Sequence, residues 1–559
     1  MSTQILMSLV TTSLVLPALW RRHERRIARR DGLPTAPISR KGRLVVLGLS
    51  SLLLVGAVGG SAFAQTTTTA PTTTAAPAAP TYATGNRTGA ASSTDPAQIL
   101  PAGTPADQQN AALAGEIAKD RVSINTVWLM VGGVLVLFMQ AGFALVETGF
   151  TRSKNASHTM MMNMVIFALG VVGWFVCGYA LMFGAASAGP LGLLPIGNAW
   201  HIGDWAMLSH SGFFLAGHAY DTSVLGFFFF QLVFMDATAT IPTGAMAERW
   251  KFSSFVVWGL FVSAILYPVY GNWVWGGGWL SQLGTMGPKW GHGAVDFAGS
   301  GVVHAMGGVA AFWGAKILGP RIGKYAKDGT PQAIPGHHIP MAFLGVFVLL
   351  VGWMGFNGAS TFAGTDLRLT VVIVNTILAS AFGCLSAMFI AWWKYGKPDA
   401  SLTANGLLAG LVAITAPCAF VAPWAAAIIG TIAGAVMFAT VIFLDHKLKV
   451  DDPVGAVAVH GAAGLWGVIA VGLFADGSYG DGLNGVVGGV KGLFYGQGGQ
   501  LAAQVTDALV LVAYCSIMTI IFFTISKKTI GMRSKEADEI EGLDISEIGT
   551  IAYPDFVKV

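Results

Sequence analysis

Long apolar segments separated by short polar loops fill the chain from about residue 122 to its charged tail. Most are twenty or more residues long, enough for a helix to cross the hydrocarbon core of a bilayer. The strands of a membrane barrel would instead alternate over about ten residues. The pattern predicts eleven transmembrane helices, and hence an all-α polytopic membrane protein. Their approximate limits are 124–148, 159–184, 223–246, 252–272, 296–317, 338–359, 369–394, 402–420, 423–444, 455–475 and 502–526.

The N-terminal region has a different pattern. Within residues 1–64, a basic stretch that reaches Arg43 precedes a short apolar run and the small residues that end at Ala64. This order is typical of a secretory signal peptide cleaved after Ala64, and a retained membrane helix is the alternative. Residues 65–122 are rich in Thr, Ala and Pro, a composition that cannot bury a core. We expect them to form a disordered linker outside the cytoplasm.

The distribution of Lys and Arg predicts how the membrane domain, residues 123–528, is oriented. If its first helix starts outside, the inward loops and the tail contain 17 of these residues, and the outward loops between helices contain three. Cytoplasmic loops carry such an excess of positive charge. We therefore expect a multi-pass protein of the inner cell membrane with its N-terminus outside and a cytoplasmic tail at 529–559. A signal peptide at 1–64 would deliver the N-terminus to the same side.

Composition excludes several classes of protein. Charged residues make up 11% of the chain, whereas a soluble domain contains roughly 25%. A soluble enzyme is therefore excluded, and no nucleophile–base motif or phosphate-binding loop suggests catalysis. The net charge of +4 is too small to indicate nucleic-acid binding. The histidines and aspartates of the outer segment 185–222 lack the spacing of a compact metal site, so we expect neither metal nor cofactor.

Two similar motifs, five predicted helices apart, contain intramembrane histidines. Asp296-Phe-Ala-Gly-Ser-Gly-Val-Val-His304 and Asp452-Pro-Val-Gly-Ala-Val-Ala-Val-His460 both consist of an aspartate, seven mostly small residues and a histidine. An odd number of helices per repeat inverts the second copy, which predicts two inverted five-helix repeats plus a final helix. Two neutral imidazoles can share a hydrogen bond and pass a proton. The alternative is two separate packing histidines bonded to backbone carbonyls.

These motifs, together with Gly352-Trp-Met-Gly-Phe-Asn357, Ala247-Glu-Arg249 and Trp275-Gly-Gly-Gly278, resemble the ammonium transporter family (Amt/Mep/Rh), in particular its bacterial Amt-like members. The resemblance covers roughly residues 123–555. It implies a homotrimer with one pore per subunit and a regulatory cytoplasmic tail that lies against a neighbouring subunit. It also implies a PII-type signal protein as a candidate partner at the cytoplasmic face.

The resemblance further implies roles for eight residues. They are His304 and His460 for the proton relay, Phe234 and Phe356 for the pore gate, Trp275 and Ser360 for ammonium recruitment, and Asp296 and Trp353 as structural residues near the site. The chemistry is consistent with these roles. An aromatic face attracts a cation, whereas a dehydrated cation in an apolar pore is costly. Neutral ammonia can therefore cross while the histidines carry the proton separately.

We interpret the chain as a transporter or channel that moves ammonium or ammonia into the cytoplasm. One alternative is a sensor that reports ammonium through its cytoplasmic face, although the short tail contains no output domain. Another is an Rh-like neutral gas channel. Trp275 argues against it, because an aromatic residue at this position favours recruitment of a cation. Sodium-coupled amino-acid transport is disfavoured because no pair of interrupted half-helices suits a carboxylate.

Two carboxylates within the apolar segments have no assigned role. Glu147 ends the first segment, and Asp236 lies two residues after Phe234. We expect Glu147 to cap a cytoplasmic helix boundary and Asp236 to bond Thr238 or a neighbouring helix.

Overall fold

The computed structural model describes residues 103–481, 486 and 488–556. Every described residue belongs to one compact unit. The predicted signal peptide at 1–64 and the linker residues 65–102 lie outside the described residues. The described part is mainly helical, as predicted for an all-α protein. Its two strands, β1 (Ala199–Ile202) and β2 (Trp205–Ser209), form an antiparallel hairpin.

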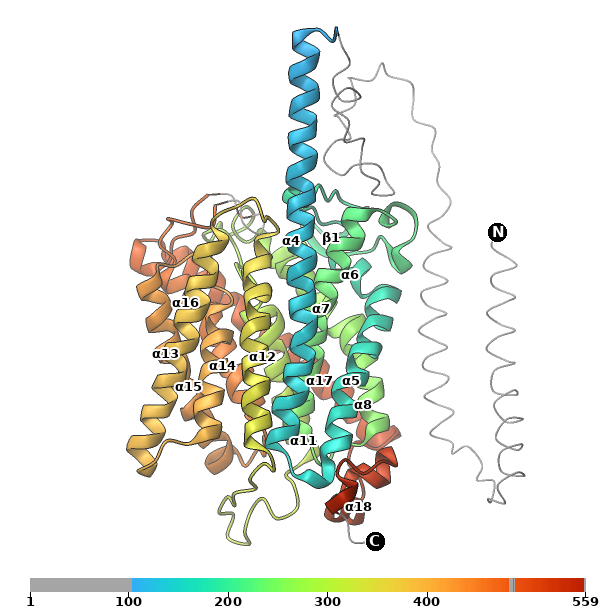
Figure 1. The fold of residues 1–559 in the computed structure, drawn as a ribbon, viewed down its shortest axis with the longest axis vertical. Coiled ribbons are helices and arrows are strands. Elements are labelled where there is room, and N and C mark those ends of the chain that lie inside the picture. The colour runs from blue at the N-terminus through green and yellow to red at the C-terminus, as the bar shows by residue number, and fades with distance from the viewer. Residues whose placement is uncertain (1–102, 482–485, 487, 557–559) are drawn as a thin grey trace, which may run out of the picture. The chain divides into compact units, whose positions relative to one another are not determined.

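Ten helical segments of the described chain are long and apolar enough to cross a membrane, and α14 is a shorter apolar helix (Figure 1). Several segments include a π-helical turn, labelled η. The bounds are α4 Ala106–Phe150; α5 Ala156–Gly173, η3 Trp174–Gly178 and α6 Tyr179–Phe183; α7 Thr222–Met246; α8 Phe252–Phe261, η7 Val262–Leu266 and α9 Tyr267–Val274; η8 Ser300–Ala305 and α11 Met306–Leu318; α12 Ile339–Gly358; α13 Leu369–Tyr395; α14 Ala400–Ile414; α15 Pro423–Phe443 and η10 Leu444–Leu448; η11 Val457–Ala462 and α16 Ala463–Phe474; and α17 Gly498–Thr529.

Shorter helical elements lie in the loops and in the tail. They include α10 Trp279–Gln282 in a loop, and α18 Glu536–Glu541 and η14 Asp544–Ile548 in the tail. The ten long segments and α14 correspond in order to the eleven apolar segments of the sequence.

The first helix, α4, is longer than the apolar pattern predicts. It begins at Ala106, eighteen residues before the predicted start, so residues 106–122 of the expected linker are helical (Figure 1). Alanine and unbranched polar side chains in this stretch have high helix propensity. Extending an existing helix also requires no new nucleation. The apolar pattern misses this extension because most of its residues are exposed and polar side chains interrupt its alanines.

The helix α14 ends six residues before its predicted end. A turn follows, and its carbonyl groups bond to a distant loop. The carbonyl oxygens of Thr415 and Ala416 accept hydrogen bonds from the backbone N–H groups of Ala298 and Phe297, at 3.1 and 3.2 Å. Irregular backbone at membrane depth is tolerated where such buried partners satisfy it. The shortened helix thereby holds the segment that leads to His304.

The two aspartate-to-histidine motifs fold alike. Asp296 and Asp452 each cap the start of a π-helical turn, η8 and η11 respectively. Each carboxylate accepts hydrogen bonds from three backbone N–H groups located three to six residues later. Between the aspartate and the turn, Gly299 has a φ of 110° and Gly455 a φ of 83°, which favour glycine. The two motifs are therefore structurally equivalent as well as similar in sequence.

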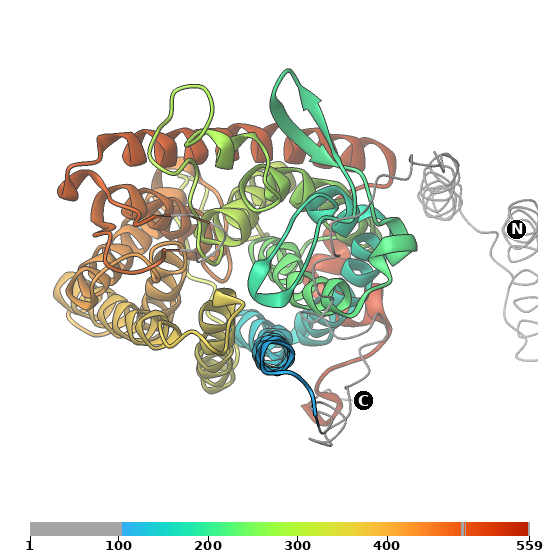
Figure 2. The ribbon, with the colours of Figure 1, turned by 90° about the horizontal axis from the view of Figure 1, so that it is seen from above.

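The last long helix, α17, lies across the outside of the bundle and is seen lengthwise from above (Figure 2). It packs against both α11 and α16. The amide Nε2 of Gln504 donates to the carbonyl oxygens of Val295 and Val468, at 2.7 and 3.0 Å. The indole Nε1 of Trp313 donates to Ser516 Oγ at 2.7 Å. This helix is therefore bonded to the segments that contain both histidine motifs.

The tail is docked onto the start of α5. The Asp544 carboxylate accepts hydrogen bonds from the backbone N–H groups of Ser157 and His158, at 3.1 and 2.9 Å. The Leu543 N–H donates to Asn155 Oδ1 at 2.9 Å. These contacts lie within one chain, whereas the family resemblance implies docking on a neighbouring subunit.

Candidate functional site

A column of aromatic rings runs through the interior of the bundle. Phe234 of α7 and Phe356 of α12 are fully buried, and their rings stack with centroids 4.0 Å apart and an interplanar angle of 27°. The ring of Trp275, which follows α9, lies 6.1 Å from that of Phe234. Trp275 Nε1 donates a hydrogen bond to the carbonyl oxygen of Asp296 at 2.6 Å. This bond fixes the orientation of the indole at one end of the column.

A cavity of about 270 Å³ adjoins this end of the column. Its lining includes Trp275, Phe234, Ser360 and Gln231, together with further aromatic side chains. The Ser360 hydroxyl donates to the carbonyl oxygen of Phe356 at 2.8 Å. Because its only proton is used in that bond, the hydroxyl oxygen presents lone pairs and can accept an N–H group.

Gln231 is a lining residue that the sequence did not single out. Its side chain is 3% exposed, and its Oε1 has no hydrogen-bond partner in the described chain. A buried carbonyl oxygen without a donor is unfavourable, so this atom is available to a ligand N–H. The signal in the sequence is a single glutamine within an apolar run, three residues before Phe234, a spacing that places both on one side of a helix.

The twin histidines lie further along the column. Nδ1 of His304 and Nδ1 of His460 are 3.2 Å apart, and the ring centroids are 5.2 Å apart. Because a neutral imidazole has one N–H and one lone pair, one Nδ1 donates and the other accepts. Nε2 of the donating ring then has a lone pair, and Nε2 of the accepting ring carries a proton. The predicted pairing is confirmed, and the two histidines are not separate packing residues.

Aromatic contacts connect the histidines to the stacked pair. The His304 ring lies 4.9 Å from the Trp353 ring and 5.4 Å from the Phe356 ring, nearly parallel to both. Trp353 Nε1 donates to Thr415 Oγ1 at 2.9 Å, in the turn that follows α14. The structure therefore brings the predicted gate, recruitment and histidine residues into one continuous column.

A close helix approach sets the position of the histidines. Gly308, one turn after His304, faces Gly461, which follows His460. A Cβ atom on Gly308 would lie 2.0 Å from the backbone nitrogen of Gly461, so only glycine fits at this crossing. On its other side, His460 packs against Phe143 of α4, with ring centroids 5.9 Å apart.

The two unassigned carboxylates have surroundings that differ from the expectations. Glu147 does not cap a helix boundary. Because α4 continues to Phe150, its carboxyl points into the bundle and bonds to Asn163 of α5 and Thr243 of α7. The hydroxyl of Thr238 donates to its own helix rather than to Asp236, and Asp236 Oδ1 has no partner in the described chain.

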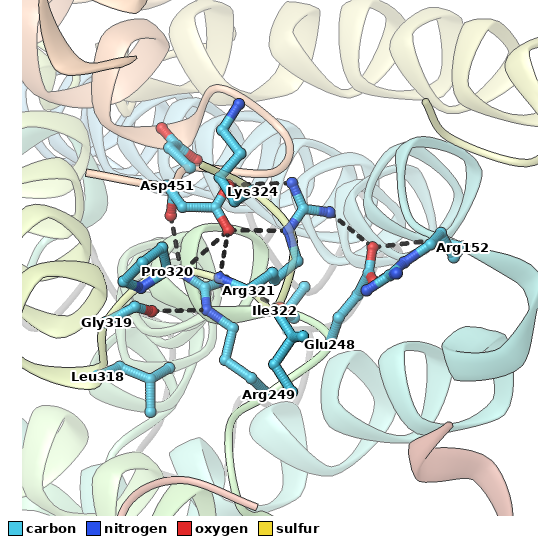
Figure 3. A network of polar contacts seen from close by, with 12 residues as sticks. Arg152, Glu248, Arg249, Leu318, Gly319, Pro320, Arg321, Ile322, Lys324 and Asp451 are labelled. Carbon is cyan, nitrogen blue, oxygen red and sulfur yellow. Dashed lines mark hydrogen bonds and ion pairs between the residues drawn. The ribbon is translucent and has the colours of Figure 1, made fainter. Parts of the chain in front are cut away.

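Figure 3 shows a network of charged side chains near the docked tail. Glu248 accepts hydrogen bonds from Arg152 and from Arg321, the latter at 2.7 Å. Asp451 accepts from Nε and Nη2 of Arg321 at 2.9 and 3.0 Å. Burial alone would raise the pKa of Asp451, but the charges of Arg249 and Arg321 hold that pKa well below its usual range. The charged residues of the 247–249 motif therefore connect the loops that contain Arg152, Arg321 and Asp451.

Comparisons with known proteins identify the family. The sequence profile described as Ammonium Transporter Family matches residues 127–553. The chain belongs to the ammonium transporter family. It is 47% identical over 437 residues to the ammonium transporter Amt2 of Archaeoglobus fulgidus, which covers 78% of this chain and 89% of the relative. It is 36% identical to the ammonium transporter Amt1 of Haloferax mediterranei, covering 78% and 80% of the two chains.

Solved structures of this family share the fold. The structure titled "Sensor Amt Protein" has a TM-score of 0.66 at 34% identity, covering 77% of this chain and 99% of the other. Candida albicans Mep2 has a TM-score of 0.64 at 28% identity, covering 78% and 91%. The protein is thus a multi-pass ammonium transporter and not an enzyme.

Proposed function

We propose that this ammonium transporter binds NH4+ in the aromatic cavity, passes neutral ammonia through the stacked rings, and relays the proton separately through the twin histidines. The observation that carries the proposal is the Nδ1–Nδ1 contact of His304 and His460, in ring contact with Phe356.

The cavity offers two kinds of contact to a small cation. The Trp275 ring supplies a cation–π interaction of about 0.5–2 kcal/mol, depending on desolvation. The hydroxyl oxygen of Ser360 and the unpartnered Oε1 of Gln231 supply acceptors for N–H groups. An ammonium ion can use both kinds of contact at once, whereas potassium can donate to neither oxygen.

Beyond the cavity, the apolar column favours the neutral molecule. Moving a dehydrated cation between the buried rings of Phe234 and Phe356 would cost many kcal/mol. Loss of a proton removes most of that cost. The proton is taken up by the histidine Nε2 that has a lone pair, crosses between the Nδ1 atoms, and leaves from the Nε2 of the other ring. Each ring then has one N–H and one lone pair again.

The finer topology is part of the proposal. We infer eleven membrane-crossing helices, built as two inverted five-helix repeats plus α17, with the N-terminus outside the inner membrane and the tail in the cytoplasm. The similar capping of η8 and η11 supports the repeat, and the excess of Lys and Arg in alternate loops supports the orientation. We also propose a homotrimer whose docked tail presents a surface to a PII-type signal protein.

Sensing of ammonium is the second candidate function. It is favoured by the 34% identity to the structure titled "Sensor Amt Protein" and by the close packing of the tail against α5. A sensor would bind ammonium in the same cavity but conduct little of it.

Current recorded from proteoliposomes given an ammonium pulse tests the proposal. We expect an ammonium current, a smaller methylammonium current and no potassium current. Flux without current would favour neutral gas conduction, and binding without flux would favour sensing.

We predict that Trp275→Leu weakens recruitment. Leucine keeps the position apolar but removes the π face, so the apparent ammonium affinity should fall about 2- to 30-fold. The measurement is the concentration dependence of the current. Trp273→Leu is the matched control, because Trp273 lies in the last turn of the same helix but donates to the Met207 carbonyl and is not part of the cavity lining. An unchanged dependence in Trp275→Leu would mean that this residue only packs.

We predict that truncation after Thr529 leaves a folded protein with altered transport or lost regulation. The cut removes the contacts of Leu543 and Asp544 with α5. The measurements are ammonium uptake and oligomer mobility. A shorter truncation after Gly549 retains those contacts and is the control. Equal uptake and an equal response to cellular nitrogen in all three proteins would show that the tail is passive.

A further inference from the structure

A buried carboxyl near the twin histidines has no part in the mechanism above. Glu147 lies on α4 one turn after Phe143, whose ring packs against His460. Residues four apart share one face of a helix, so Glu147 lies on the same face of α4 as Phe143, about 6 Å further along the helix axis. The helix continues toward Arg152, which belongs to the charged network. Glu147 therefore lies between the twin histidines and the end of the bundle where the tail docks.

Close packing places the carboxyl beside the segment that leads to the second histidine. A Cβ atom on Gly244 of α7 would lie 2.4 Å from Val454 Cγ2 and 3.3 Å from Glu147 Oε1. Val454 precedes η11, the turn that contains His460. The Glu147 side chain is 2% exposed, and among the described residues it forms no ion pair.

The hydrogen-bond partners of Glu147 indicate that its carboxyl group is protonated. Thr243 Oγ1 lies 2.8 Å from both carboxyl oxygens and 2.5 Å from the carbonyl oxygen of Thr240. A hydroxyl has one proton, and an ionised carboxylate and a carbonyl can only accept. With an ionised Glu147, two of these three contacts would contain no proton. With a proton on Oε1, Glu147 donates to Thr243, and Thr243 donates to Thr240.

The second carboxyl oxygen is satisfied in the same arrangement. Asn163 Nδ2 donates to Glu147 Oε2 at 2.7 Å, and the Thr240 hydroxyl donates to Asn163 Oδ1 at 3.0 Å. Gln140 Nε2 also donates to Asn163 Oδ1, at 3.4 Å. The amide of Asn163 is thereby held with its NH2 group toward Glu147. A neutral carboxylic acid leaves one fewer of these oxygen–oxygen contacts without a proton than a carboxylate does, and a buried unpaired charge is avoided.

We propose that Glu147 is a neutral carboxylic acid that donates its proton to ammonia after ammonia has passed the twin histidines. The lone pair of ammonia forms a new N–H bond while the O–H bond of Glu147 breaks, which yields NH4+ and a carboxylate. Asn163 already donates to that carboxylate, and the Thr243 hydroxyl turns from the Thr240 carbonyl toward it. A proton delivered by the histidine relay restores the acid. This inference rests on the proposed separate route of ammonia and proton.

The substitution Glu147→Gln tests the step with little change in shape. The amide NH2 can donate to Thr243 and the amide oxygen can accept from Asn163, but the side chain has no transferable proton. We expect the ammonium current to fall about 100-fold while the protein remains folded. Glu116→Gln is the matched control, since Glu116 lies in the exposed part of the same helix and pairs only with Lys119.

Comparison with a histidine variant separates this inference from the proposed function. Wild-type current in Glu147→Gln, with loss of current in His304→Ala, overturns the role of Glu147 and supports the histidine relay. Wild-type current in both His304→Ala and His460→Ala overturns the relay itself. Loss in both variants, with wild-type current in Glu116→Gln, supports both.

Infrared spectroscopy tests the protonation state independently of transport. We expect the wild-type protein to show a protonated carboxyl band that Glu147→Gln lacks and Glu116→Gln retains. The band should weaken during steady ammonium flux. Identical carboxyl bands in the wild type and Glu147→Gln would show that Glu147 is ionised, and would overturn the proposal.

Discussion

Replacing His304 with alanine is expected to reduce the ammonium current about 100-fold or more, because a positioned proton carrier contributes that much or more to proton transfer. Alanine leaves His460 Nδ1 without its partner at 3.2 Å and interrupts the relay. It also vacates the space against the Trp353 ring, where water can enter. We therefore expect a new potassium leak. Currents for ammonium, methylammonium and potassium in proteoliposomes measure both effects.

The control for this substitution is His201→Ala. His201 is exposed on the β1–β2 hairpin, and its ring bonds to the backbone carbonyl oxygen of Ala199, two residues earlier. Its loss should change neither current nor selectivity. Normal current and selectivity in both His304→Ala and His460→Ala, at equal amounts of inserted protein, would contradict the relay.

Replacing Arg321 with methionine is expected to destabilise the protein by about 3 kcal/mol. Removing one partner of a buried ion pair leaves an uncompensated charge, which costs about 3–5 kcal/mol. Arg321 pairs with both Glu248 and Asp451, and all three are almost fully buried (Figure 3). The lower figure applies because Arg152 and Arg249 remain near the two carboxylates. Thermal unfolding of the detergent-solubilised protein measures the effect.

The matched control is Arg368→Met. Arg368 pairs with Asp366, but their side chains are 34% and 22% exposed, and such surface pairs contribute about 0–1 kcal/mol. A similar loss of stability in both variants would show that the buried network is no more important than a surface pair.

The apolar pattern predicts the membrane helices closely because burial in lipid acts on a whole segment. The predicted limits 223–246 and 338–359 differ by one residue or less from α7, Thr222–Met246, and α12, Ile339–Gly358. The extension of α4 could not be predicted in this way, since helix propensity rather than burial stabilises it. Nor could the early end of α14, because the turn that replaces its predicted end is bonded to residues 297 and 298, which are distant in the sequence.

The residues of the candidate site differ in the same way in how far the sequence predicts them. The pairing of His304 and His460 is predictable because a repeated motif relates the two residues. Gln231 and Glu147 are single polar residues in apolar segments, and their sequence neighbours reveal little about them. Their properties depend on other helices: a missing donor at Gln231 and a surplus of acceptors at Thr243. Such properties emerge only when the helices are packed together.

The helix α17 limits how the transporter can move. Proteins built from inverted repeats often work by rocking one half against the other. Here the side chain of Gln504 bonds to both Val295, which precedes His304, and Val468, which follows His460. Each such bond contributes about 1 kcal/mol to stability. Rocking would break these bonds in every cycle. In the proposed architecture of two repeats, α17 therefore holds both repeats in place, and we expect small rotations of individual rings to be enough for a molecule to pass.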